Sequence, residues 1–201
     1  MFTFRNLPSN AGISGIALGA VALLFGLALS ALADSPESLL PPFAGKGYEF
    51  TKTAKNDHHI SGWLPVKWCD NSKWAAVNAT YTKLPDSPDK DAAAVRIEIK
   101  NVDDGQFQLT TFDGNYEYKK GTKYVVSGWV RSERFTNLKV GAREEDEPHA
   151  FYDQIDVPTG AEWKRFKFVF TPAMDCVAWI MFVVKEAGTV DLAGITVVEE
   201  Q

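Results

Sequence analysis

The densest group of ionisable side chains is an acidic run over residues 144–147, which is followed by Pro148 and His149. Glycoside hydrolases hold two carboxyl groups at a fixed separation, one on either side of the bond that they cleave. Neighbouring residues of a strand face opposite ways, and a surface loop fixes no separation between carboxyl groups. We therefore expect this run to be a solvated loop between two strands rather than a catalytic pair.

Other patterns that could support catalysis or metal binding are weak. His58 and His59 are adjacent in a polar segment, so their side chains diverge and are poorly placed to share one metal ion. Ser127 lies in Val-Val-Ser-Gly, which is typical of a strand, and the chain has no Gly-x-Ser-x-Gly motif. The sequence thus identifies no catalytic residue and no metal ligand.

Another set of side chains suits the binding of a sugar. Trp129 and Arg131 lie on the same side of one predicted strand. Gln108 and Arg143 lie in two other predicted strands, each on the side that carries polar residues. An indole offers a stacking surface to the C–H face of a pyranose, while amide and guanidinium groups hydrogen-bond to its hydroxyls. These side chains would line one face if their strands share a sheet; the alternative is an ordinary solvated face with Trp129 half buried.

The residues after the acidic run extend this hypothesis. His149, Phe151 and Tyr152 combine a polar ring with two aromatic ones in a predicted loop. We expect them to contact a ligand at the rim of the binding face.

Period-two alternation predicts the elements that would position these residues. Val95, Ile97 and Ile99 alternate with charged side chains, and residues 177–184 are apolar on both parities, as in a strand covered on both faces. Further strands are predicted at 48–53, 75–82, 106–112, 124–131, 138–143, 165–170 and 190–198. Short strands without helical periodicity or repeats indicate an all-β, antiparallel sandwich of a single domain.

The N-terminus has the features of an export signal. Arg5 precedes an apolar run that ends in Ala-Leu-Ala at residues 31–33, a small-x-small cleavage site. We expect a signal peptide over 1–33, a linker or extended lead-in over 34–47, and the sandwich over 48–201. The alternative is an uncleaved membrane anchor, since a span needs about 20 apolar residues.

Export bears on the two cysteines, Cys69 and Cys176. An even count in an oxidising compartment predicts a disulfide between them, and the alternative is two buried thiols. No Cys or His lies at metal-ligand spacing from either residue.

Charge limits the class of partner. The formal net charge is −5, and no Lys/Arg cluster is present. Nucleic acids and anionic membranes require a basic face, so we expect neither as a partner once the signal peptide is removed.

Three segments carry a resemblance to a known family. YKKGTKYVVSGWVRS (118–132) and GAEWKRFKFVFTP (160–172) precede a closing strand after Gly-Thr-Val at 188–190. This order resembles the galactose-binding-like jelly-roll carbohydrate-binding modules, which include xylan- and β-glucan-binding modules. The resemblance spans 62–198. It implies a jelly-roll β-sandwich that binds a polysaccharide or glycan on its concave face, with Gln108, Trp129 and Arg131 in the cleft.

The same resemblance implies a structural calcium ion, for which this sequence departs from the pattern. The family's Asp-Asp pair of the last strand falls at Ala193 and Gly194, and Phe50 is followed by Thr51 instead of Glu. Asp191 lies two residues away on the same strand face and could substitute as a ligand. We therefore expect no cofactor, with calcium as the alternative.

Together these features predict a secreted, non-catalytic carbohydrate-binding protein. The alternatives are a secreted β-sandwich that binds a protein partner, as in adhesion, and a small glycan hydrolase or lyase.

Export gives a first testable prediction. N-terminal sequencing of the protein recovered outside the cytoplasm should begin at Asp34, because the Ala-Leu-Ala site directs cleavage there. A full-length chain retained in the membrane fraction would contradict this expectation.

Overall fold

Almost every element of the chain is a β-strand. The computed structural model describes residues 37–40, 43, 46–90, 92–111, 116–133, 138–145, 147–157 and 159–200. Within these residues the single helical element is the 3-10 turn η1, Lys55–Asp57. The described residues contain no helix that is long and apolar enough to cross a bilayer. The predicted signal peptide, 1–33, lies outside the described residues.

The larger of two sheets, here called the back sheet, has seven strands. It contains β1 (Gly47–Thr53), β2 (His59–Pro65), β4 (Ala76–Leu84), β5 (Ala94–Asp104), β13 (Gly188–Glu199), β8 (Tyr124–Ser132) and β11 (Gly160–Phe170), in this spatial order. All neighbours are antiparallel except β2 and β4, which pair in parallel.

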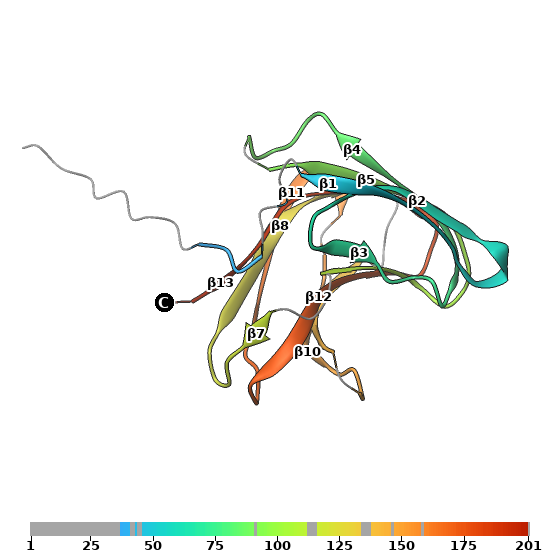
Figure 1. Ribbon diagram of the computed structural model, residues 1–201. Helices are drawn as coiled ribbons and strands as arrows, with labels where there is room; N and C mark the ends of the chain where they lie inside the picture. Colours follow the sequence, from blue (N-terminus) through green and yellow to red (C-terminus); the bar gives the residue numbers. More distant parts are fainter. Residues whose placement is uncertain are drawn as a thin grey trace, which may run out of the picture. The chain divides into compact units, whose positions relative to one another are not determined.

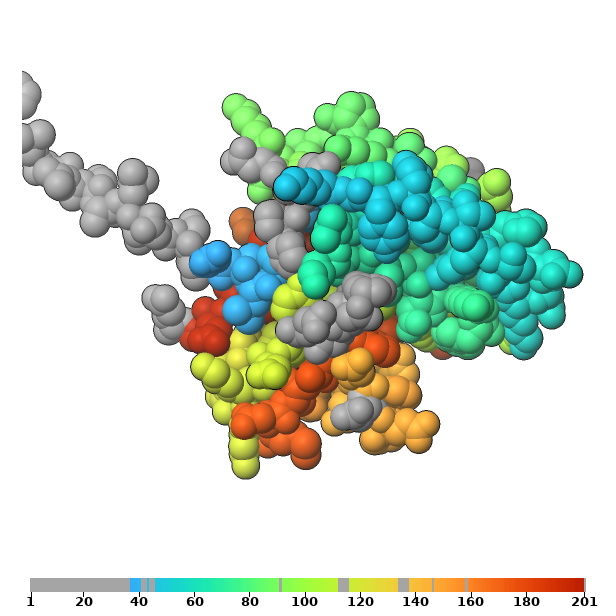
Figure 2. All heavy atoms as spheres, viewed as in Figure 1, coloured from blue at the N-terminus to red at the C-terminus, as the bar shows by residue number. Residues whose placement is uncertain are grey.

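The front sheet has six strands. Its order is β10 (Phe151–Asp156), β9 (Lys139–Glu144), β12 (Cys176–Val184), β6 (Phe107–Thr111) and β3 (Trp68–Asp70), and β7 (Glu117–Tyr118) also pairs with β12. Figure 1 shows β1, β2, β4 and β5 in one layer and β3 and β12 in the other. In the space-filling view of Figure 2, the atoms of β9 and β10 (light orange) lie beside those of β12 (orange). The two packed sheets confirm the predicted jelly-roll sandwich.

The core lies between the sheets and is built from alternate residues of each strand. Val95, Ile97 and Ile99 of β5 are at most 3% exposed, as their alternation predicts. On β12 the inward parity holds Ile180 and Phe182, and the outward Met181 is also fully buried. The prediction that this strand is covered on both faces therefore holds for residues 180–184, whereas Val177 and Trp179 are half-buried.

A buried carboxylate anchors β3 at the edge of the front sheet. Tyr81 Oη donates to Asp70 Oδ2 over 2.5 Å, and Lys52 Nζ lies 2.5 Å from Oδ1. The backbone N–H of Ser72 donates to the same carboxylate over 2.8 Å. Because these donors satisfy the buried charge, β3 and the residue after Asp70, Asn71, are held in a fixed position on the sheet.

The predicted disulfide is wrong, since Cys69 and Cys176 are not bonded to each other. Cys69 on β3 is aligned with Thr110 on β6, and Thr110 is aligned with Met181 on β12. Cys176 lies five residues before Met181, which at ~3.3 Å per residue is a displacement of about 16 Å. A disulfide requires Cα atoms within about 7 Å.

Thiol labelling tests this separation. The unfolded protein, with no reductant added, should take up two maleimide groups, because Cys69 and Cys176 are not bonded to each other. A mass spectrum with no adduct, becoming two adducts only after reduction, would contradict the observed strand register.

Candidate ligand-binding site

The predicted binding residues divide between the two sheets. Gln108 and Arg143 lie on β6 and β9 of the front sheet, whereas Trp129 and Arg131 lie on β8 of the back sheet. Each pair faces outward, on opposite sides of the sandwich. The expectation that all four line one face is therefore wrong, because their strands do not share a sheet.

The outer face of the front sheet contains a pocket of about 330 Å³. We call it the Trp179 pocket. Its lining comes from the β3–β4 connection, from β6, β9 and β12, and from the loop between β9 and β10: Asn71, Trp74, Gln106, Gln108, Arg143, His149 and Trp179. Trp74 is 51% exposed and stands at the edge, while Gln108 is only 3% exposed. Three of the predicted residues, Gln108, Arg143 and His149, are thus brought together.

Strand register places the two central side chains. Trp179 and Arg143 are cross-strand partners on β12 and β9, so both project outward beside each other. The β9–β10 loop then folds back over them: Arg143 Nε donates to the carbonyl of His149 over 3.0 Å. The His149 ring stacks against Trp179, with centroids 6.4 Å apart and planes at 17°.

His149 adopts a left-handed backbone conformation, with φ at 57°. Non-glycine residues are uncommon in this conformation, although histidine adopts it more often than most, and it persists where surrounding contacts hold it. The bond from Arg143 to its carbonyl and the stacking on Trp179 are those contacts. The imidazole is consequently fixed over the sheet instead of moving with an open loop.

Several buried polar atoms on this face have no hydrogen-bond partner. Among the described residues, the unpaired buried atoms of the Trp179 pocket are Trp179 Nε1 and His149 Nδ1, and Thr110 Oγ1 lies on the same parity of β6 as Gln108. A buried donor or acceptor without a partner costs about 1–3 kcal/mol. Both nitrogens are closed to solvent, so a polar ligand can hydrogen-bond to them only after a local shift of the side chains that cover them.

Two amides complete the polar lining. Asn71 Nδ2 donates to Gln108 Oε1 over 3.0 Å, which fixes the orientation of both side chains. The backbone N–H of Asn71 also donates to the carbonyl of Gln108, over 2.8 Å. These bonds leave the Nε2 donors of Gln108 and the Oδ1 acceptor of Asn71 for a ligand.

The two aromatic residues predicted at the rim differ in placement. Phe151 packs on the outer face, with the Arg143 guanidinium 6.0 Å from its ring centroid. A side chain at Gly141 would lie 2.7 Å from that ring, so the close approach requires glycine. Tyr152 packs against the core, and its hydroxyl donates to Glu144 over 3.4 Å. Burial raises the pKa of the Tyr152 hydroxyl, and this residue does not line the pocket.

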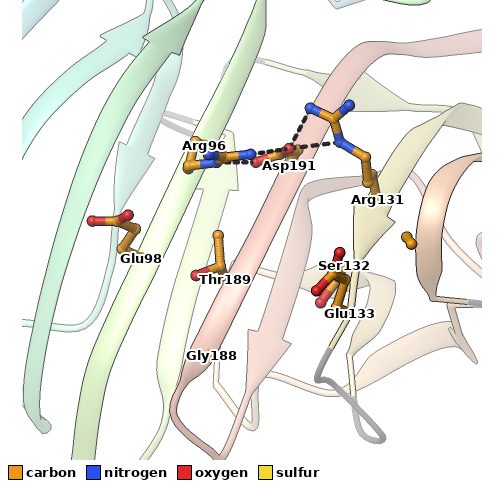
Figure 3. A pocket seen from close by; sticks show the side chains of 9 residues that line it. Arg96, Glu98, Arg131, Ser132, Glu133, Gly188, Thr189 and Asp191 are labelled. Carbon is orange, nitrogen blue, oxygen red and sulfur yellow. Dashed lines mark hydrogen bonds and ion pairs between the residues drawn. The ribbon is translucent and has the colours of Figure 1, made fainter.

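The outer face of the back sheet contains a different arrangement, shown in Figure 3. Arg96 and Arg131 approach Asp191 from neighbouring strands, with nitrogen–oxygen distances of 2.7 to 2.9 Å. Asp191 is 2% exposed, and both of its oxygens accept these bonds. Arg131 also stacks on Trp163, 4.5 Å from the ring centroid. A hollow of about 510 Å³ lies over this ion-pair network.

This network bears on the calcium alternative. Asp191, the residue that could substitute as a ligand, already accepts from two guanidinium groups. In the described residues, no three His, Cys, Asp or Glu side chains are grouped so as to hold a metal ion. The charge of Asp191 is therefore balanced by arginine.

Sequence reasoning missed Trp179, Trp74 and Asn71. Trp179 lies in a run that is apolar on both parities, so alternation alone did not separate its outward face from its inward one. No other feature of that run distinguished Trp179 from the core residues beside it.

Comparisons with known proteins bear on the fold. No protein-family model and no curated protein matches the chain. Among solved structures, a family 4 carbohydrate-binding module is 20% identical, with a TM-score of 0.51 over 66% of this chain and 86% of that module. The enzymatically active domain of tailspike protein 4 from bacteriophage CBA120 is 17% identical, with a TM-score of 0.51 over 67% of this chain and 20% of that domain. The chain has the β-sandwich fold of carbohydrate-binding modules.

The ion-pair network gives a prediction about stability. Replacing Asp191 with Asn should lower the free energy of unfolding by about 2–4 kcal/mol, because two guanidinium groups would face each other without a carboxylate. Denaturant unfolding measures the change. Asp86→Asn is the matched control: this carboxylate is 3.5 Å from Arg131 and 60% exposed, so its loss should cost less than about 1 kcal/mol. Equal effects of the two substitutions would contradict a buried role for Asp191.

Proposed function

We propose that this protein binds a glycan on the outer face of the front sheet, in the Trp179 pocket, and that it does not cleave the glycan. The fold it shares with carbohydrate-binding modules supports the ligand class. The proposed binding residues are Asn71, Trp74, Gln108, Arg143, His149 and Trp179. We also propose that it acts outside the cytoplasm, because residues 1–33 have the features of a signal peptide.

The observation that carries this proposal is the state of Trp179. Its indole lies at an outward position of the front sheet, stacked on one ring, with an Nε1–H that has no acceptor in the described part of the chain. Sugars satisfy both needs of such a group, since they offer C–H faces to aromatic surfaces and hydroxyl oxygens to donors. The nearby amides of Asn71 and Gln108 can bond to adjacent hydroxyls.

The composition of the pocket supports binding without hydrolysis. None of the described residues that line it is Asp or Glu. Hydrolysis of a glycosidic bond requires two carboxyl groups placed around it, or a recognised substitute for them. Glu144, from the acidic run, instead accepts a bond from Tyr152 away from the pocket.

Pull-down on insoluble polysaccharides tests the proposal and its location. Trp179→Ala should weaken retention on any polymer that binds by about 10-fold or more, since truncated aromatic anchors typically cost over 1 kcal/mol. Trp129→Ala is the matched control, because it removes an indole from the outer face of the back sheet and should leave retention unchanged.

The reverse result would contradict the location. Loss of retention with Trp129→Ala but not with Trp179→Ala would place the site on the back sheet, around Trp129 and Arg131. Retention of no polysaccharide across a broad panel would contradict glycan binding itself. Release of soluble sugar from a retained polymer would contradict the non-catalytic assignment.

A further inference from the structure

Within the described residues, the Trp179 pocket contains a cation, Arg143, that has no counter-ion. Arg143 has three contacts in the described residues: the carbonyl of His149 at 3.0 Å, the sulfur of Met181 at 3.9 Å and the ring of Phe151 at 6.0 Å. None of these is a carboxylate. Two other outward arginines, Arg96 and Arg131, share the carboxylate of Asp191. Arg143 therefore differs from them in having no ion pair with any carboxylate of the described residues.

Among the described residues, no Asp or Glu side chain forms an ion pair with Arg143. Lys139 and Asp156 are cross-strand partners at 2.6 Å and neutralise each other. Glu144 follows Arg143 on the strand, faces the opposite way and accepts from Tyr152. Among the described residues that line the pocket, Arg143 is the single charged side chain apart from the titratable His149.

Partial burial of the Arg143 guanidinium costs free energy, and the side chain cannot avoid this cost by losing its proton. Partial desolvation lowers the pKa of Arg143. A guanidinium nevertheless stays protonated over the whole physiological range. The desolvation cost is therefore present at every physiological pH, and an anion bound in the pocket would lower it.

The guanidinium also keeps donors for such a group. It has five N–H bonds, of which Nε–H serves the His149 carbonyl and one on Nη1 serves the Met181 sulfur. The remaining three lie on the terminal nitrogens, whose planar geometry matches two oxygens of an anion.

We propose that the ligand of the Trp179 pocket is an acidic glycan, in which an anionic group on the sugar binds Arg143 while Trp179 and the amides contact the ring. This inference rests on the proposed function and specifies its substrate class. The shared chemistry is a pair of anionic oxygens, which a uronic acid carboxylate or a sulfate ester can supply.

The net charge of the protein limits how it could bind an acidic glycan. The chain carries a formal net charge of −5, so general electrostatics oppose the approach of a polyanion. Any preference for acidic over neutral glycans must come from a local cation. That preference should then depend on one residue.

Affinity electrophoresis with the full chain tests the assignment. The probes are polygalacturonate and alginate for carboxylates, dextran sulfate with plain dextran for sulfate, and xylan and a mixed-linkage β-glucan as neutral polymers. We expect retardation by at least one acidic polymer. Arg143→Gln should weaken that binding by about 10- to 100-fold, the range for a charge-assisted hydrogen-bonded pair. Arg165→Gln, an equal charge change at an exposed position of β11 on the back sheet, should leave it unchanged.

Three outcomes would decide against the inference, each in a distinct way, and a fourth would identify the anion. Binding to neutral polymers alone would overturn the acidic ligand while leaving the proposed function intact. Equal weakening by Arg143→Gln and Arg165→Gln would show general electrostatics instead of a site. Binding to no polymer would overturn both proposals. Retardation by dextran sulfate but not by the uronates would assign the anion to a sulfate ester.

Discussion

Strand β12 contributes side chains both to the core and to the candidate site, because its residues alternate between the inner and the outer face of the front sheet. Ile180 and Phe182 face inward and are at most 1% exposed, while Trp179 and Met181 face outward from the same strand. Its neighbours β9 and β6 fix its register, which sets Trp179 beside Arg143. A change in that register by one residue would exchange core and site, so the packing of the two sheets also determines the pocket.

The two outer faces of the sandwich differ in how completely their polar groups are paired. On the back sheet, Asp191 accepts from two arginines, and Arg131 also stacks on an indole. In the described part of the front sheet, Trp179 Nε1 and His149 Nδ1 have no hydrogen-bond partner, and Arg143 has no counter-ion. Paired groups stabilise the fold by themselves, whereas unpaired ones gain from a ligand. This contrast favours the front sheet as the functional surface.

Local pattern was a good guide to the strands and a poor one to their partners. Period-two alternation predicted β5 and the burial of Val95, Ile97 and Ile99, because one side of a strand must cover the core. It could not assign β6 and β8 to different sheets, since pairing depends on contacts between distant segments. For the same reason the sequence brought Gln108 and Trp129 together wrongly, and it paired Cys69 with Cys176 across an intervening strand.

Nuclear magnetic resonance of the indole N–H groups tests the central claim most directly. The chain has six tryptophans, and single Trp→Phe substitutions can assign their signals. On addition of an oligosaccharide that binds, the Nε1–H signal of Trp179 should shift, because the ligand packs against its indole in the pocket, while that of Trp129 on the other sheet should stay in place. A shift of Trp129 with no change at Trp179 would contradict the account.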